Sequence, residues 1–346
     1  MSTAHLHALN DIKLINIRDV WFDRLHRLFA GNDDTETVFA LNGINGQATD
    51  NSLMYSEPER WVAECLGNLA ESAEQAQNTD VFTPLCVEYS AFGVHFVDSI
   101  FGCNVYFKDG QWQSDYLSGE IGALTAPDLD KSEPWQLAIR AAKAFTNADV
   151  TLPLFGLPTI ASALNIAVNL YGEQILTEML CNPENAAHDL KVINDTLIEL
   201  HRRMLKLIPA NQLQPVCAAS RTQPPGFGQL CGCTTQLISP DCYREMAAPF
   251  DSELLSVYPH GGMIHLCGTH EHHIPAFRET QALRSFQLND RASEGLAEYY
   301  NGLRADQIIY FTPCEKISAE KAVEITGGER LVLIGSHQIK KRSKRV

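Results

Sequence analysis

The stretch "MIHLCGTHEHHIPAFRETQALRSFQLND" (263–290) contains two short runs typical of β-strands, 263–268 and 284–290, separated by a segment of helical length. The first run is apolar apart from His265. Such runs are typical of parallel strands that are covered on both faces. Because parallel neighbours need a long crossover connection, this stretch predicts a strand–helix–strand unit.

The same alternation extends through the chain. Between the strand-like runs lie helical patterns, the clearest at 182–208, where the start signal is Asn182-Pro183-Glu184. A second helix is expected to begin at Ser239-Pro240. The strand-like runs number eight: 38–43, 80–86, 150–156, 214–220, 263–268, 284–290, 308–313 and 331–336.

Eight such units predict an α/β fold, a (β/α)₈ TIM barrel of parallel strands formed by a single domain, 1–346. Residues of about 1–36 are expected to form a helical extension, and 102–117 an inserted β-hairpin that turns at Asp109-Gly110. No glycine-rich nucleotide fingerprint follows any strand. Only about ten residues follow the last strand, so the eighth helix is expected to be short or missing.

Bulk properties limit the partners. The net charge of −15 disfavours nucleic acid and anionic lipid. No apolar run is long enough to span a membrane, and the N-terminus lacks the pattern of a signal peptide, so a cytoplasmic protein is expected. The ten cysteines are therefore expected to be free thiols, a few of them ligands. The basic tail, 339–346, is interpreted as a frayed solvated end, with a docking arm for an acidic partner as the alternative.

His265 and Cys267 stand at the end of one predicted strand. Residues two apart on a strand point to the same side, so both side chains can face the barrel mouth. Imidazole with thiolate suits zinc. The pair by itself is a weak indication, because two such residues can also meet by chance at a strand end.

The surroundings of this pair resemble a known family. The segments "LISPDCYREMAAPFDSELLSVYPHGGMIHLCGTH" (237–270), "EYSAFGVHFVDSIFGCNVYFKDGQW" (88–112) and "LPLFGLPTIASALNIAVNLYGEQILTEMLCNPENAAHDL" (152–190) resemble the uroporphyrinogen decarboxylase superfamily. The first segment is similar to the zinc methyltransferases of that superfamily, whose signature is His-x-Cys-Gly after a strand, preceded by a helix opened by Ser-Pro. The resemblance covers, in patches, most of residues 50–340.

The resemblance implies that His265 and Cys267 are zinc ligands and that a third ligand, a cysteine in the family, follows the final strand. That place reads "LIGSHQ" (333–338), where Ser336 or His337 stands instead. His337 is a chemically adequate substitute, Cys314 in "FTPCEK" is the rival, and another residue such as His270 is a further alternative.

Other polar residues at the predicted mouth are candidates for catalysis. Asn289 and Asp290 follow the sixth strand and could orient a substrate, as could Asn42, Asn45 and Thr312, although such residues often only cap loops. Glu271 in "CGTHEHH" either supports the ligands or moves a proton, or belongs to an exposed polar loop.

The segment "RTQPPGFGQLCGCTTQ" (221–236) reads as a lid or binding loop. Cys231 and Cys233 are interpreted first as residues that line or cover a pocket, with metal ligation as the lesser alternative. Arg221 could pair with an anionic substrate group.

Decarboxylation of a tetrapyrrole is disfavoured, because "ALNGINGQATDN" (40–51) has no arginine where the decarboxylases carry several for the propionates of their substrate. Glu88 and Asp98 are accordingly interpreted as structural.

The functional hypothesis is a zinc-dependent methyltransferase that moves a methyl group between a small methylated compound or thiol and a corrinoid. The resemblance implies zinc as cofactor, cobalamin carried by a partner corrinoid protein, and association as a homodimer. The alternatives are a decarboxylase or lyase of the same superfamily and a non-catalytic corrinoid-binding barrel.

Overall fold

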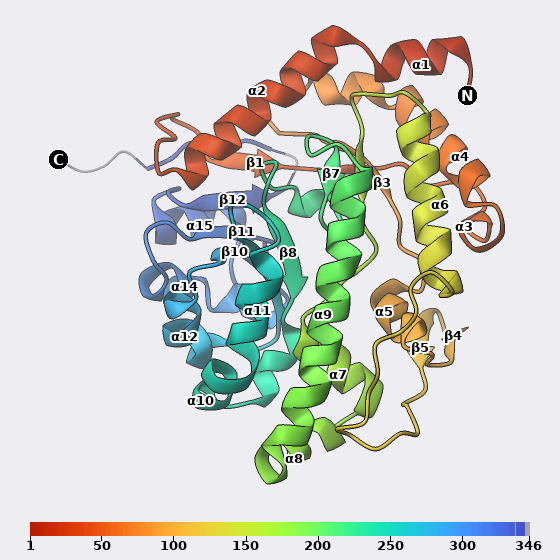
Figure 1. Ribbon diagram of the computed structural model, residues 1–346. Helices are drawn as coiled ribbons and strands as arrows, with labels where there is room; N and C mark the ends of the chain where they lie inside the picture. The colour runs from red at the N-terminus through yellow and green to blue at the C-terminus, as the bar shows by residue number, and fades with distance from the viewer. Residues whose placement is uncertain (336, 343–346) are drawn as a thin grey trace.

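The computed structural model in Figure 1 describes residues 1–335 and 337–342. Its strands are β1 (Phe39–Leu41), β2 (Ile44–Asn45), β3 (Leu85–Glu88), β4 (Val105–Lys108), β5 (Gln111–Ser114), β6 (Leu154–Gly156), β7 (Leu213–Gln214), β8 (Gly228–Cys231), β9 (Gly262–Cys267), β10 (Leu283–Asn289), β11 (Ile308–Phe311) and β12 (Leu331–Ile334). Its helices are α1 (Thr3–Leu9), α2 (Ile12–Phe29), α3 (Leu53–Ser56), α4 (Pro58–Glu71), α5 (Phe96–Ile100), α6 (Glu133–Asn147), α7 (Ala163–Tyr171), α8 (Gln174–Cys181), α9 (Pro183–Leu207), α10 (Pro240–Cys242), α11 (Ala248–Leu255), α12 (Ile274–Glu279), α13 (Arg291–Glu294), α14 (Leu296–Gly302) and α15 (Ala319–Thr326).

The strands form two adjoining parallel sheets. One has the order β1-β12-β11-β10-β9-β8 and the other β2-β3-β6-β7. Backbone hydrogen bonds from Asn42 N to Phe82 O and from Ile44 N to Pro84 O, both 2.9 Å, connect the β1–β2 segment to the second sheet. Within the described residues β7 and β8 are the two ends of this array, and no ladder joins them. The mixed α/β class with parallel strands is therefore confirmed, whereas a closed ring of strands is not seen.

A hydrophobic cluster lies inside the strand array. It takes residues from both sheets and from α2: Trp21, Phe22, Leu25, Leu28, Phe29, Phe39, Leu41, Phe82, Cys86, Leu154, Ala219, Phe227, Met263, Ile308, Tyr310 and Val332. Because strands of both sheets contribute to one cluster, the array is curved around it. Helix α2, drawn in red across the top of Figure 1, covers the end where Phe39 and Ile308 begin their strands. The carboxyl ends of the strands lie at the opposite end.

Strand β8 was not predicted from the sequence. Its residues belong to the glycine- and proline-rich segment predicted as a loop. The glycine at the start of β8 serves packing rather than a turn, because a Cβ on Gly228 would lie 2.3 Å from the ring of Tyr258. The neighbouring predicted run, 214–220, forms strand only at Leu213–Gln214 and continues into the 3₁₀ turn Ala219–Arg221.

Several local predictions are confirmed. Helix α9 begins at Pro183, and the side chain of Ser239 accepts a hydrogen bond from the backbone of Cys242 as the N-cap of α10. The hairpin β4–β5 turns at Asp109 and Gly110, whose φ angles are 52° and 79°. Both residues take the left-handed conformation that a two-residue hairpin turn requires.

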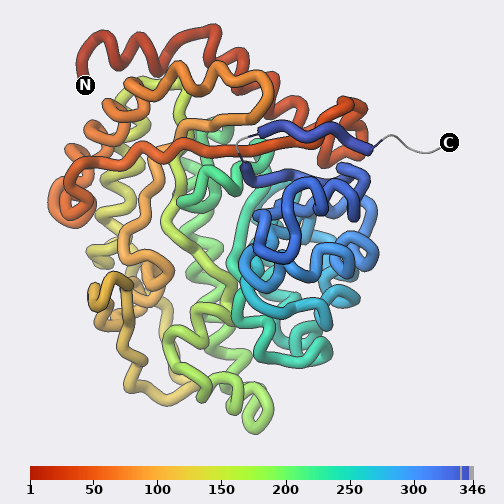
Figure 2. The backbone as a smooth tube through the Cα atoms, turned by 180° about the vertical axis from the view of Figure 1, so that it is seen from behind, coloured from red at the N-terminus to blue at the C-terminus, as the bar shows by residue number. Residues whose placement is uncertain are grey.

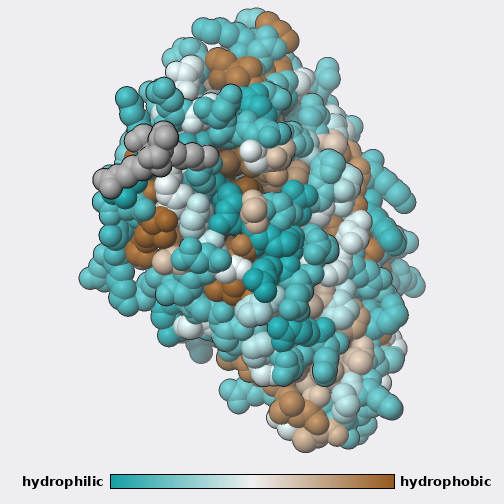
Figure 3. Space-filling model, turned by 90° about the vertical axis from the view of Figure 1, so that its left-hand side faces the viewer, coloured by the Kyte–Doolittle hydropathy of each residue, from teal (hydrophilic) through white to brown (hydrophobic). Residues whose placement is uncertain are grey.

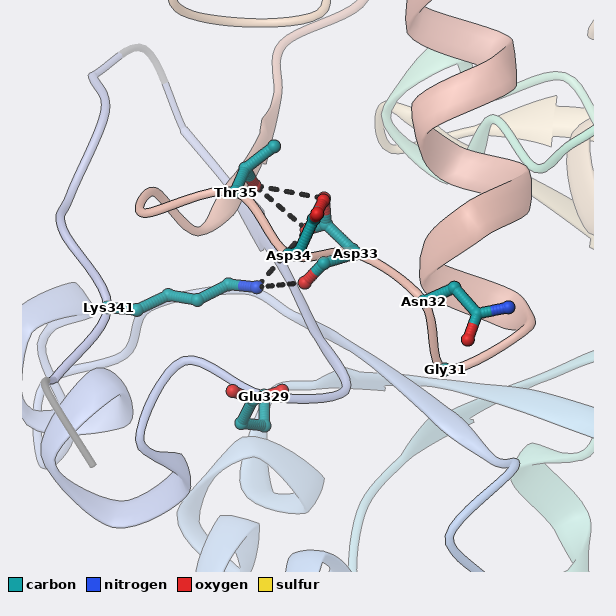
Figure 4. Close-up of a pocket in the computed structure, with 7 residues that line it drawn as sticks. All are labelled: Gly31, Asn32, Asp33, Asp34, Thr35, Glu329 and Lys341. Carbon is teal, nitrogen blue, oxygen red and sulfur yellow. Dashed lines mark hydrogen bonds and ion pairs between the residues drawn. The ribbon is translucent and has the colours of Figure 1, made fainter. Parts of the chain in front are cut away.

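The basic tail is docked up to Arg342, so the prediction of a frayed end is wrong for 339–342. Val38 N donates to Ile339 O at 2.8 Å, and Lys340 and Thr37 form an isolated antiparallel β-bridge. Figure 2 shows the two chain segments side by side. The Nζ atom of Lys341 lies 2.8 Å from Asp33 O and 3.3 Å from Asp33 Oδ2, beside a pocket of about 550 Å³ (Figure 4). Residues 343–346 of the predicted tail lie outside the described residues.

The surface in Figure 3 is mostly hydrophilic, with hydrophobic side chains in small separate patches. In the part of the chain that the structure describes, no helix has the length and apolar content needed to cross a bilayer.

Candidate metal centre

Three side chains from β8, β9 and the turn after β8 form a cluster of metal-binding character. The ligand atoms of Cys231, Cys233 and His265 all lie within 4.8 Å of one another. Cys231 and His265 are partners in the parallel register of β8 and β9, so their side chains project to the same side. The Sγ atoms of Cys231 and Cys233 are 3.4 Å apart. Of the two interpretations of these cysteines from the sequence, the arrangement favours metal ligation over pocket lining.

Cys267 adjoins this cluster. It stands two residues after His265 on β9, and its Sγ is 2.7 Å from the Sγ of Cys233. Hydrogen bonds with Cys233 lower the pKa of Cys267 to about 4 and that of Cys231 to about 6, and the same bonds raise the pKa of Cys233. Cys231 and Cys267 therefore favour the thiolate, the form in which cysteine binds metals.

His265 is oriented by a glutamine. Its Nδ1 is hydrogen-bonded to Oε1 of Gln287, which is its partner in the register of β9 and β10. The amide of Gln287 is held in turn by contacts from its Nε2 to Thr312 Oγ1 at 3.4 Å and to Leu288 O at 3.5 Å. This bond leaves Nε2 of His265 available to a metal. Sequence reasoning missed Gln287, although it stands two residues before Asn289 and so shares its strand face.

Cys231 is also held from outside its strand. Asn165 on α7 donates from Nδ2 to Cys231 Sγ at 3.6 Å, and its Oδ1 accepts from Thr234 N at 3.0 Å. The backbone N of Ser162 donates to Cys231 O at 3.0 Å. The segment after β6 therefore anchors the end of β8. No pattern in the sequence pointed to Asn165.

The structure does not bring the two predicted third ligands to this cluster. Within 1–335 and 337–342, the group of ligand atoms contains neither Cys314 nor His337. His337 is exposed, and its Nε2 is 3.9 Å from Glu320 Oε1. Cys314 follows β11, whose neighbour β10 separates it from β9. Ser336, the other residue considered there, lies outside the described residues.

The residues predicted for catalysis divide into two sets. Asn289 pairs with Cys267 in the strand register, and the charge of Asp290 opposes the lowering of the Cys267 pKa by Cys233 and His265. Asp290 also has a φ of 48°, which non-glycine residues rarely adopt. Glu271 forms the second set. Its carboxylate lies against Gly295, where its Oε1 occupies the space that a Cβ on this glycine would take.

His270 does not offer a free nitrogen. Its Nδ1 is 2.9 Å from Thr235 Oγ1 and its Nε2 is 2.9 Å from Cys267 O. It therefore ties the loops after β8 and β9 together, and the alternative of His270 as a ligand finds no support in this geometry.

The donor set fits zinc. Thiolates with one imidazole, at sulfur-to-sulfur separations that a single ion can bridge, match the mixed nitrogen and sulfur coordination of zinc. His265 has the outer hydrogen bond that metal-bound histidines usually have. Magnesium and calcium, which prefer oxygen ligands, fit this set poorly.

Comparisons with known proteins agree with the fold. No family model matches the chain, and no curated protein matches it in sequence. Among solved structures, the chain is similar to a methyltransferase from Methanosarcina mazei, at 10% sequence identity over 94% of both chains, with a TM-score of 0.61. At this identity, the likeness establishes a shared fold.

Proposed function

We propose that this protein is a zinc-dependent methyltransferase that moves a methyl group between a small methylated compound or thiol and a corrinoid carried by a partner protein. The observation that carries the proposal is the Cys231–Cys233–His265 cluster, with Cys267 beside it, at the carboxyl ends of parallel strands. The fold likeness to a methyltransferase and the resemblance of residues 237–270 to the zinc methyltransferases support it.

The proposed fold is a (β/α)₈ barrel. Its support is the single interior cluster to which both sheets contribute, together with the bond from Ser162 N to Cys231 O, which links the β6 connection to β8. In such a barrel, functional groups collect at the carboxyl ends of the strands, where the cysteine and histidine cluster stands.

The proposed ligands are Cys231, Cys233 and His265, with Cys267 as a fourth donor. A catalytic zinc site keeps one position that exchanges with substrate. Cys267 is the donor we assign to this exchange, because it lies outside the group of three whose ligand atoms are all within 4.8 Å of one another, although its Sγ is 2.7 Å from that of Cys233. Zinc in such a site holds a substrate sulfur as thiolate at neutral pH or polarises the group that leaves the methyl.

Residues around the cluster orient its ligands. Gln287 fixes the ring of His265, and Asn165 bonds to Cys231, so two of the donors are held before metal arrives. Asn289 and Asp290 flank Cys267, the exchangeable position, and are proposed to contact the substrate there. The corrinoid partner, the homodimer and the cytoplasmic location belong to the same proposal.

The test is a metal and methyl-transfer assay. Purified protein is expected to contain about one zinc per chain, and His265→Ala and Cys233→Ser to lose it, whereas Cys242→Ser, outside the cluster, keeps it. With reduced cobalamin and a panel of methylated compounds, the cobalt absorption spectrum is expected to change to that of methylcobalamin.

Two outcomes would contradict the proposal. Absence of bound zinc in protein purified without chelators would favour a non-catalytic barrel. Release of carbon dioxide without cobalamin would favour the decarboxylase alternative.

A further inference from the structure

Within the described residues, Arg221 is a cation whose side chain has no partner. It is the last residue of the 3₁₀ turn Ala219–Arg221 and is partly buried. In the chain as described, its guanidinium makes no hydrogen bond or ion pair. Loss of hydration without a compensating contact is costly for a charged group. The five N–H donors of Arg221 are therefore available to a ligand.

Glu88 presents the opposite charge next to this turn. It is the last residue of β3, and its Oε1 accepts a hydrogen bond of 2.6 Å from the backbone N of Ala219. No ion pair joins Glu88 to Arg221 in the described structure, although Arg221 is only two residues from Ala219. Burial raises the pKa of Glu88, and the bond from Ala219 and the charge of Arg221 offset this only in part.

The turn that carries Arg221 is held in place, and the segment after β6 connects its flank to the metal cluster, because Thr159 lies beside Cys217 and the backbone N of Ser162 donates to Cys231 O at 3.0 Å. Tyr310 OH donates to Thr222 O at 2.9 Å, and Thr159 Oγ1 lies 3.4 Å from Cys217 Sγ. The charge of Arg221 also helps to lower the pKa of Cys231, although the hydrogen bond with Cys233 contributes more. A ligand that extends from the cluster to this turn would thus meet a cation and an anion of the protein.

A ligand with a single charge would suit only half of this arrangement. A simple anion would bind Arg221 but be repelled by Glu88, and a simple cation would meet the reverse. A compound with one carboxylate and one ammonium group satisfies both. In a protein of net charge −15, Arg221 also supplies the local attraction that a carboxylate needs.

We propose that Arg221 and Glu88 recognise a zwitterionic small molecule of the α-amino-acid class, whose carboxylate binds Arg221, whose ammonium binds Glu88 and whose sulfur reaches the metal cluster. This inference rests on the proposed function, because it places the reacting atom of that substrate at the cluster. It identifies Arg221 and Glu88 as specificity-determining residues.

The first experiment compares thiol probes that differ in one charged group. The protein is loaded with Co²⁺ in place of zinc, and the visible spectrum follows binding of L-cysteine and L-homocysteine, their analogues without ammonium (3-mercaptopropionate and 4-mercaptobutyrate) and those without carboxylate (cysteamine and 3-aminopropanethiol). At least one amino acid is expected to bind about tenfold or more tightly than both of its analogues, as loss of a charged hydrogen bond predicts. Equal binding within each series would overturn the inference.

Substitutions at Arg221 and Glu88 test which charged group of the ligand each residue recognises. Arg221→Gln is expected to remove the preference for a carboxylate and keep that for an ammonium, and Glu88→Gln the reverse. Arg202→Gln, which changes an exposed arginine on α9, is the matched control and should keep both preferences. A single-site variant that loses both preferences with an intact Co²⁺ spectrum would also overturn the assignment.

The two proposals fail in different ways. If Co²⁺ shows no thiolate coordination, the proposed metal site fails, and calorimetry with the metal-free protein then tests the zwitterion site alone. In that protein L-cysteine or L-homocysteine is still expected to bind more tightly than its analogues, because Arg221 and Glu88 do not depend on the metal. If Co²⁺ binds as expected but no amino acid is preferred, only this further inference is refuted.

Discussion

Replacing Gln287 by leucine should weaken zinc binding without unfolding the protein. In the structure, Oε1 of Gln287 is the acceptor for the Nδ1 proton of His265, and both side chains are buried, with exposed fractions of 4% and 7%. Leucine has a similar volume but offers no acceptor. The Nδ1 proton would then be buried without a partner, and the imidazole would lose the bond that presents Nε2 to the metal.

The magnitude follows from that single bond. A buried donor left unsatisfied costs about 1–3 kcal/mol, and loss of an outer partner of a metal-bound histidine lowers metal affinity about 10- to 100-fold. Gln287→Leu should therefore bind zinc about 10- to 100-fold more weakly than the wild type. Gln287→Glu keeps an acceptor for Nδ1 and should retain most of the affinity.

Competition with a chromophoric chelator measures these affinities, and circular dichroism confirms folding. Gln307→Leu is the matched control, because Gln307 is equally buried but its Nε2 bonds Phe277 O at 3.2 Å and Leu283 O at 2.9 Å, away from the cluster. The control should lower stability and leave zinc affinity unchanged. Zinc affinity in Gln287→Leu within about twofold of the wild type, in folded protein, would refute the assignment of Gln287.

Three further changes test the ligands and the fold. Cys233→Ser should reduce zinc affinity by at least about 100-fold, because it removes the thiol that contacts both other cysteines, and chelator competition would show it. Burial raises the pKa of Asp251 to about 7, so folding stability should fall as pH rises from about 4 to 7, by up to ~1.4 kcal/mol per pH unit. Asp251→Asn, which carries no charge and can still accept from Tyr243, should abolish this slope in urea titrations at different pH values; an unchanged slope would contradict it. Lys341→Met should lower the free energy of unfolding by about 1–3 kcal/mol in urea, because Lys341 contacts the buried Asp33, and no loss would mean that the docked tail adds little stability.

Local elements could be predicted because their causes are local. The hairpin turn at Asp109-Gly110, the start of α9 at Pro183 and the N-cap at Ser239 each depend on a few adjacent residues. The pairing of His265 with Cys267 on one strand face is equally local, because the two-residue period of a strand places them together.

The two other cysteines of the cluster could not be predicted from the sequence. Cys231 and Cys233 lie more than thirty residues before His265, in a segment whose prolines and glycines indicated a loop. They join His265 only because that segment becomes β8 and pairs with β9 in a register that sets Cys231 beside His265. The prediction of Cys314 or His337 relied on position in the chain and had no access to this pairing.

Composition and local pattern were thus sufficient for the α/β class and the parallel strands, and the resemblance added His265 of the candidate metal centre and Cys267 beside it. Tertiary structure alone decided which donors accompany them, that Gln287 and Asn165 orient two of the donors, and that Glu88 lies next to the turn of Arg221 without an ion pair in the described structure. The physical reason is the distance along the sequence over which each feature is determined. Strand period and turn conformation depend on neighbouring residues, whereas the register between strands and long-range hydrogen bonds depend on which segments the folded core brings together.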